Sequence, residues 1–144
     1  WPTPTARVTT VGEALHELMG SAGWEGASAW AAEAQDIAPT LVGGSKKHGG
    51  ADLGPTRAKR AWAERHKVNA LGVADAPPQP GFVGMPRLTV QMAAVVQGFP
   101  PTWEFSGGKT AAYRQVGNAF PPPVARAVGT QIARALKASE TRAS

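Results

Sequence analysis

Short apolar stretches with helical spacing, separated by glycine and proline, run through much of the chain. Thr10 and Glu13 have the spacing of a capping box, so a helix should begin there and end near Gly20. Pro55 and Thr89 suit the first turns of two further helices. The helices expected from these patterns cover 10–19, 24–35, 55–66, 89–97, 110–115 and 121 to about 138. The last of them carries an apolar stripe formed by Val124, Val128, Ile132, Ala135 and Leu136.

The segments between these helices favour extended or irregular structure. Residues 36–42 have the pattern of a short strand that Pro39 interrupts, and 43–50 form a glycine-rich basic loop. Residues 68–86 contain glycines, prolines and short apolar stretches, which predict irregular chain with one or two short strands. The predicted fold class is therefore α/β, as a mixed α+β fragment with a small lobe of short strands and helices.

The composition excludes several kinds of chemistry. The 144 residues include no cysteine, which rules out disulfides, thiolate metal sites and thiol catalysis within this chain. The three histidines have no metal-ligand spacing, so no metal site is expected. No apolar run is long enough for a membrane helix, and no signal peptide is visible. The chain begins with Trp1 instead of an initiator Met, which suggests a processed, excised or truncated piece.

The positive charge is concentrated in one segment. The chain has 15 basic and 10 acidic residues, a net charge of +5. Between Ser45 and Lys67 there are seven basic residues against Asp52 and Glu64, so this segment holds the whole excess. A localised positive field attracts polyanions such as DNA. Taken alone, the segment fits a solvated surface equally well.

Two blocks near the C-terminus stand out. The first ends in Gln97-Gly98-Phe99-Pro100, and the second runs from Lys109 through Gly117-Asn118-Ala119 to Pro121-Pro122. In this order they resemble the last two conserved motifs of the cytosine-5 DNA methyltransferases. Thr40-Leu41 is similar to a dipeptide of that family's target-recognition region. The resemblance implies a division into 1–36 as a helical connector, 37–86 as the target-recognition region, and 87–144 as the conserved motifs with a bracing helix. The family's catalytic cysteine and cofactor loop have no counterpart here.

The resemblance, together with the charge pattern, assigns candidate site residues. Asn118 and Ala119 would line the amino-acid end of S-adenosylmethionine, with Gly117 at positive φ, although a helix stop with a cap would explain the same residues. No catalytic residue and no metal ligand is assigned. Thr40 would support the DNA-reading loops, unless it is an ordinary β-branched strand residue. The expected DNA-binding residues are Thr40, Ser45, Lys46, Lys47, His48, Arg57, Lys59, Arg60 and Arg87.

The function implied is that of a C-terminal part or subunit of a DNA (cytosine-5-)-methyltransferase. The chain would bind double-stranded DNA and share S-adenosylmethionine with a catalytic half, supplied by the same gene product or by a separate subunit. Its last helix would brace that half, a doubly wound lobe, and the chain alone would be inactive. A bacterial restriction–modification enzyme, cytoplasmic and associated with the nucleoid, is the expected setting. The alternatives are a non-catalytic DNA-binding module and a gene remnant.

Overall fold

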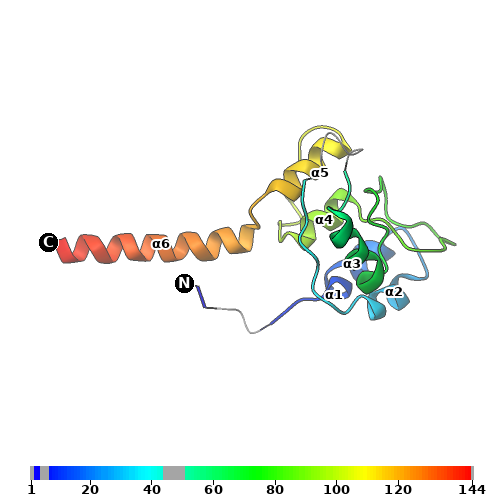
Figure 1. Ribbon diagram of the computed structural model, residues 1–144, viewed down its shortest axis with the longest axis horizontal. Coiled ribbons are helices and arrows are strands. Elements are labelled where there is room, and N and C mark those ends of the chain that lie inside the picture. The colour runs from blue at the N-terminus through cyan, green and yellow to red at the C-terminus, as the bar shows by residue number, and fades with distance from the viewer. Residues whose placement is uncertain (1, 4–6, 44–50, 144) are drawn as a thin grey trace.

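Helices α1 to α6 make up the regular structure of the residues that the computed structural model describes, namely 2–3, 7–43 and 51–143 (Figure 1). Their bounds are α1 Val11–Gly20, α2 Ala27–Glu33, α3 Thr56–His66, α4 Val90–Val96, α5 Lys109–Asn118 and α6 Pro122–Ala143. Over these described ranges there is no sheet, and the extended pairing is one isolated parallel bridge between Ala74 and Thr89. The expected α/β fold class is therefore wrong, because the described chain is helical.

The expected strands fail because their backbone groups are bonded elsewhere. At the start of 36–42, the Asp36 carbonyl accepts a hydrogen bond from Val11 N at 3.1 Å, which ties the segment to α1. Pro39 removes a further donor from any ladder. Residues 68–86 include four prolines and make single backbone bonds instead of a ladder, such as Asn69 N to Pro86 O at 2.9 Å.

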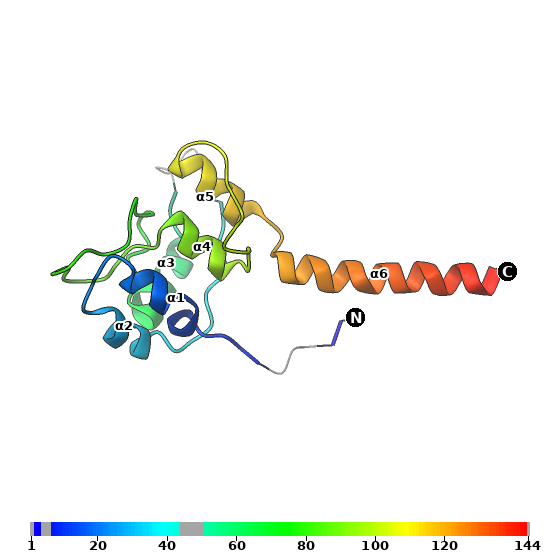
Figure 2. The ribbon, with the colours of Figure 1, turned by 180° about the vertical axis from the view of Figure 1, so that it is seen from behind.

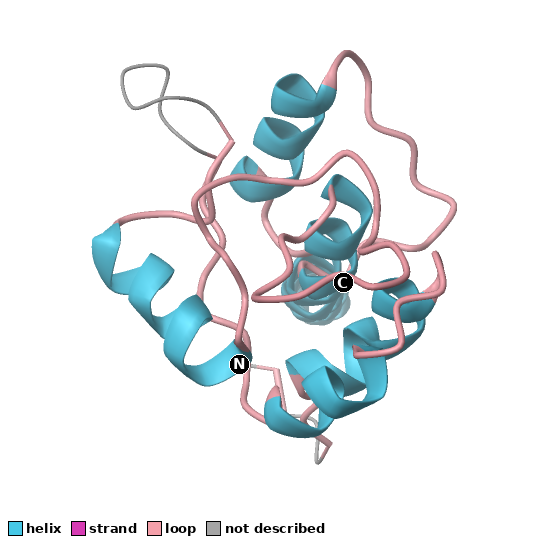
Figure 3. Cartoon of the chain, turned by 90° about the vertical axis from the view of Figure 1, so that its right-hand side faces the viewer, coloured by secondary structure: helices cyan, strands magenta, loops and turns pink. Residues whose placement is uncertain are grey.

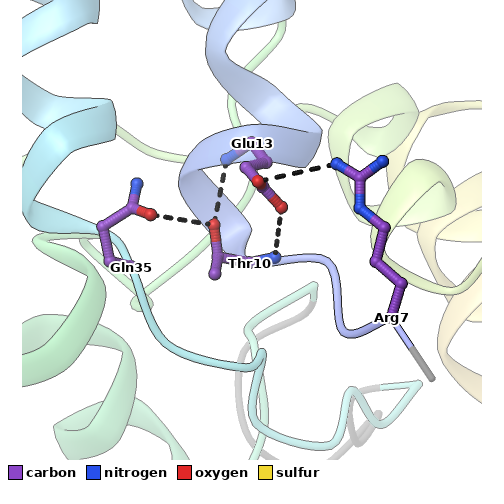
Figure 4. A network of polar contacts seen from close by, with 4 residues as sticks. All are labelled: Arg7, Thr10, Glu13 and Gln35. Carbon is purple, nitrogen blue, oxygen red and sulfur yellow. Dashed lines mark hydrogen bonds and ion pairs between the residues drawn. The ribbon is translucent and has the colours of Figure 1, made fainter.

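The predicted capping box at the start of α1 is confirmed (Figure 4). Glu13 N donates to Thr10 Oγ1 and Thr10 N donates to Glu13 Oε2, each at 3.2 Å. Arg7 lies 3.6 Å from the same carboxylate, and Thr10 Oγ1 donates to Gln35 Oε1 at 3.4 Å. The first turn of α1 is thereby fixed both to the chain before it and to the segment that follows α2.

The core lies where α1 packs on α2 and α4, α4 packs on α5, and α2 packs on α3. Trp62 and Tyr113 are fully buried within it. The large aromatic side chains of Trp103 and Phe120 are instead 56% and 62% exposed. Both lie outside the packed helices, in the connections before α5 and before α6, where the described chain does not cover them.

Helix α6 projects from this body as a straight rod (Figures 1 and 2). Figure 3 shows it end-on, behind the other helices. On its apolar stripe Val124 is 44% exposed, Ile132 57% and Leu136 60%. None of the described helices is long and apolar enough to cross a membrane. The rod therefore presents an uncovered apolar stripe in this structure.

Candidate functional site

The two residues expected at the cofactor lie in the turn that joins α5 to α6. Asn118 is the last residue of α5, and its side chain is exposed. Ala119 caps the helix in an extended conformation, with φ −71° and ψ 142°, and its N–H donates to Val116 O at 3.2 Å. Gly117 lies within the helix and is not among the glycines with positive φ, so that prediction is wrong. The helix does not end at Gly117. It continues to Asn118, and the extended backbone of Ala119 ends it.

The block that ends in Gln97 to Pro100 is hydrogen-bonded to this turn. Gln97 Nε2 donates to Val116 O at 3.1 Å and to Ala119 O at 3.5 Å, which satisfies two carbonyls at the end of α5. Gly98 has φ +81°, and a Cβ there would come within 2.6 Å of Pro123 Cγ. The two motifs that are similar to the methyltransferases in sequence are thus packed against each other in space.

A third segment reaches the same turn, in a contact that the sequence patterns did not predict. Leu41 to Gly43 cross the end of α5, and a Cβ on Gly117 would lie 2.6 Å from both Gly43 Cα and Gly43 N. On its other side the segment meets the start of α3, since a Cβ on Gly54 would lie 3.1 Å from Val42 Cγ2. Glycine at both 43 and 117 was the available signal, because close backbone crossings require residues without a side chain.

The expected DNA-binding residues have different surroundings. Arg57 and Arg60 lie on α3 with exposed side chains, three residues apart and so on one face. Lys59 is partly buried, and its ammonium pairs with Asp52. Its charge is therefore compensated, which the sequence did not indicate. Ser45, Lys46, Lys47 and His48 lie outside the described residues.

The remaining two DNA-binding candidates are exposed. Thr40 lies in extended chain that belongs to no strand, just before the crossing over α5. Arg87 lines an open groove of about 750 Å³ together with the loop from Ala74 to Pro86. Among the described residues, no hydrogen bond or ion pair joins Thr40 or Arg87 to the turn between α5 and α6.

Two buried polar side chains lie near these elements. The Tyr113 hydroxyl on α5 has no hydrogen-bond partner among the described residues, and burial raises the pKa of Tyr113, with the nearby Asp52 charge adding to this. His66 at the end of α3 is also fully buried, with neither ring nitrogen hydrogen-bonded within the described structure. Both side chains therefore remain uncharged near neutral pH. The described residues contain no cluster of three His, Cys, Asp or Glu side chains that could hold a metal ion.

The sequence comparisons identify the family. The family described as C-5 cytosine-specific DNA methylase matches residues 24–134 of this chain. The chain belongs to this family. No solved structure matches the chain significantly.

Two bacterial type II methyltransferases are similar along nearly the whole chain. The Type II methyltransferase M.NaeI of Lentzea aerocolonigenes is 65% identical over 94% of this chain and 33% of its own length. The Type II methyltransferase M.NgoMIV of Neisseria gonorrhoeae is 48% identical over 95% of this chain and 44% of its own length. DNA (cytosine-5)-methyltransferase 2 of Arabidopsis thaliana is 45% identical over 46% of this chain and 5% of its own length. The chain thus spans less than half the length of these relatives.

Proposed function

We propose that the chain is the C-terminal portion of a DNA (cytosine-5-)-methyltransferase, which binds target DNA and completes the cofactor pocket. The observation that carries this proposal is the exposed turn at Asn118, held by Gln97 and followed directly by a helix with an uncovered apolar stripe. An exposed apolar surface of this kind marks an interaction site. A catalytic portion that docks along α6 would come to lie beside Asn118, as a shared pocket requires.

The DNA-facing surface belongs to residues 37–86 in this proposal. Arg57 and Arg60 can reach base edges or phosphates, since their side chains are exposed and lie on one helix face. Arg87 and Thr40 would add contacts from the adjoining loops, and the basic segment 45–48 follows Thr40 after four further residues. Neighbouring residues 1–36 serve as the connector and 87–144 as the conserved motifs.

The reaction divides between the two portions. S-adenosylmethionine would supply the methyl group that is transferred to carbon 5 of a cytosine flipped out of the duplex. In this chain, the Asn118 carboxamide can donate and accept hydrogen bonds at the polar end of the cofactor, while the Ala119 backbone closes the turn. Because the chain has no cysteine, the nucleophile comes from the catalytic portion. A bacterial restriction–modification system is the proposed setting.

Reconstitution tests this division. Purified chain, a catalytic portion ending before residue 1, and the mixture of the two are each incubated with DNA and radiolabelled S-adenosylmethionine. We expect methyl transfer from the mixture and none from this chain alone. Transfer by the isolated chain would show that the division is wrong, and so would the failure of the two portions to form a complex.

A non-catalytic DNA-binding module is the second candidate. It is favoured by the fact that α1 to α5 and their loops enclose a core that does not require α6. The two candidates differ in what α6 does, since only the enzyme needs this helix to dock a catalytic portion. Removal of residues 124–144 should leave DNA affinity intact on either view, but only the enzyme would lose complex formation and methyl transfer.

A further inference from the structure

Gly43 occupies a position between the DNA-facing segment and the cofactor turn. It follows Thr40 by three residues, and it is buried against the end of α5. Its φ is outside the positive region that favours glycine, so its own backbone would accept alanine. What excludes a side chain is the neighbour: a Cβ on Gly43 would overlap the Asn118 carboxamide, 2.5 Å from Cγ and 2.6 Å from Nδ2.

The turn is held through its backbone, and the Asn118 carboxamide is bounded on one side by Gly43. Gln97 secures the backbone of the turn through Val116 O and Ala119 O. The backbone at Gly43 forms a wall along the side chain of Asn118, whose remaining surface is exposed. Because Asn118 is otherwise free to turn toward solvent, this wall is the contact that limits where its amide can point.

We propose that Gly43 is a positioning residue for the Asn118 carboxamide, and so for the amino-acid end of S-adenosylmethionine. The inference rests on the proposed function, because it takes Asn118 as a cofactor-binding group. It also couples DNA binding to S-adenosylmethionine binding, because a shift of segment 40–43 when DNA binds would move the Gly43 backbone that contacts the Asn118 carboxamide. Cofactor affinity should accordingly differ between the free enzyme and the DNA complex.

The test compares Gly43→Ala, Asn118→Ala and the double variant in the enzyme reconstituted from both portions. The measurements are the dissociation constant of S-adenosylhomocysteine with and without DNA, the KM for S-adenosylmethionine, kcat and the melting temperature. Gly20→Ala is the matched control, because a Cβ there meets Ala27 Cβ at an ordinary 3.4 Å and touches no residue of the turn.

Each single variant should weaken cofactor binding about tenfold, as expected when one hydrogen-bonding group is lost or displaced. The double variant should be no weaker than Asn118→Ala, because both changes remove the same interaction. The KM should rise with kcat changed little, and the melting temperature should stay near that of the parent enzyme. Gly20→Ala should match the parent in every measurement.

Three outcomes would overturn the proposal while leaving the proposed function standing. The first is full cofactor affinity in Gly43→Ala while Asn118→Ala binds the cofactor more weakly. The second is a double variant whose loss of affinity is the product of the two single losses. The third is a lower melting temperature in Gly43→Ala that persists in the double variant. A reconstituted enzyme in which Asn118→Ala changes nothing would instead count against the cofactor role of Asn118 itself.

Discussion

Arg57 and Lys59 lie two residues apart on α3 but have different electrostatic surroundings. The Arg57 side chain is exposed at the start of the helix, whereas the Lys59 ammonium pairs with the partly buried Asp52. A cation that already has a carboxylate partner gains less from a phosphate, because binding would first have to separate the pair. The structure therefore ranks two residues that the sequence had placed in one class.

Salt-dependent DNA binding should separate these two residues. Arg57→Ala should weaken DNA binding and reduce the slope of log affinity against log salt by about 1, since one phosphate contact is lost. Lys59→Ala should leave the slope nearly unchanged and lower the free energy of unfolding by up to about 1 kcal/mol. Fluorescence anisotropy at several salt concentrations measures the first effect, and urea unfolding measures the second. Equal slopes for both variants would contradict the ranking.

His66 should make the stability of the fold depend on pH. Its ring is fully buried at 5.1 Å from the ring of Trp62. Burial lowers the pKa of His66 below its usual value of 6.5, against the opposing effects of the Asp36 charge and the Ile37 backbone. The unfolded chain therefore takes up a proton more readily than the folded one, so stability is complete above about pH 6.5 and falls as the pH drops toward the folded pKa.

Urea unfolding between pH 7.5 and 5 can measure this effect. The free energy of unfolding should fall with decreasing pH by no more than about 1.4 kcal/mol per pH unit, the limit for one proton. His66→Gln should be less stable overall, because it changes the packing against Trp62, and its curve should be flatter. His16, which is exposed on α1, provides the control as His16→Gln. An unchanged pH slope in His66→Gln would show that another group is responsible.

At the scale of elements, the crossing of segment 41–43 over α5 depends on Gly117. A Cβ at residue 117 would lie 2.6 Å from backbone atoms of Gly43 and Val42, and a backbone cannot turn aside as a side chain can. Gly117→Ala should therefore lower the free energy of unfolding by about 1–3 kcal/mol, although alanine favours helix. Gly129→Ala is the matched control, since a Cβ there meets nothing within 4 Å and should stabilise α6 slightly. Thermal unfolding of Gly117→Ala at or above the parent temperature would show that the crossing tolerates a side chain.

Local signals in the sequence predicted those elements whose ends are fixed by neighbouring residues. Thr10 and Glu13 satisfy each other's backbone groups within four residues, and α1 begins where they indicate. Thr89 likewise caps α4 through Met92 N. The expected strands were wrong because a strand needs a distant partner. Asp36 O accepts instead from Val11 N at the start of α1, and Pro86 O accepts a single bond from Asn69 N. The contact between Gly43 and Gly117 was missed for the same reason, as 74 residues separate the two in the printed sequence.

At the scale of the whole molecule, the chain consists of a body formed by α1 to α5 and a rod formed by α6 (Figure 1). The body has its own core, whereas the stripe on α6 has no cover within the described chain. Residues 7–9 leave α1 toward the side from which α6 projects. A catalytic portion docked on α6 would then lie on this side of the body.

Charge placed on the α6 stripe should block docking without affecting the body. Ile132→Asp and Leu136→Asp should weaken complex formation with the catalytic portion at least about 100-fold, because a carboxylate would be buried without a partner. The melting temperature of the isolated chain should hardly change, since both side chains are exposed before docking.

Thr130→Asp is the control: at 100° per residue it lies about 200° from Ile132, and so it places the same charge on the opposite face. Titration calorimetry measures all three affinities. Equal weakening by Thr130→Asp would mean that the effect is general electrostatic repulsion, and unchanged affinity for Ile132→Asp would show that the catalytic portion docks elsewhere.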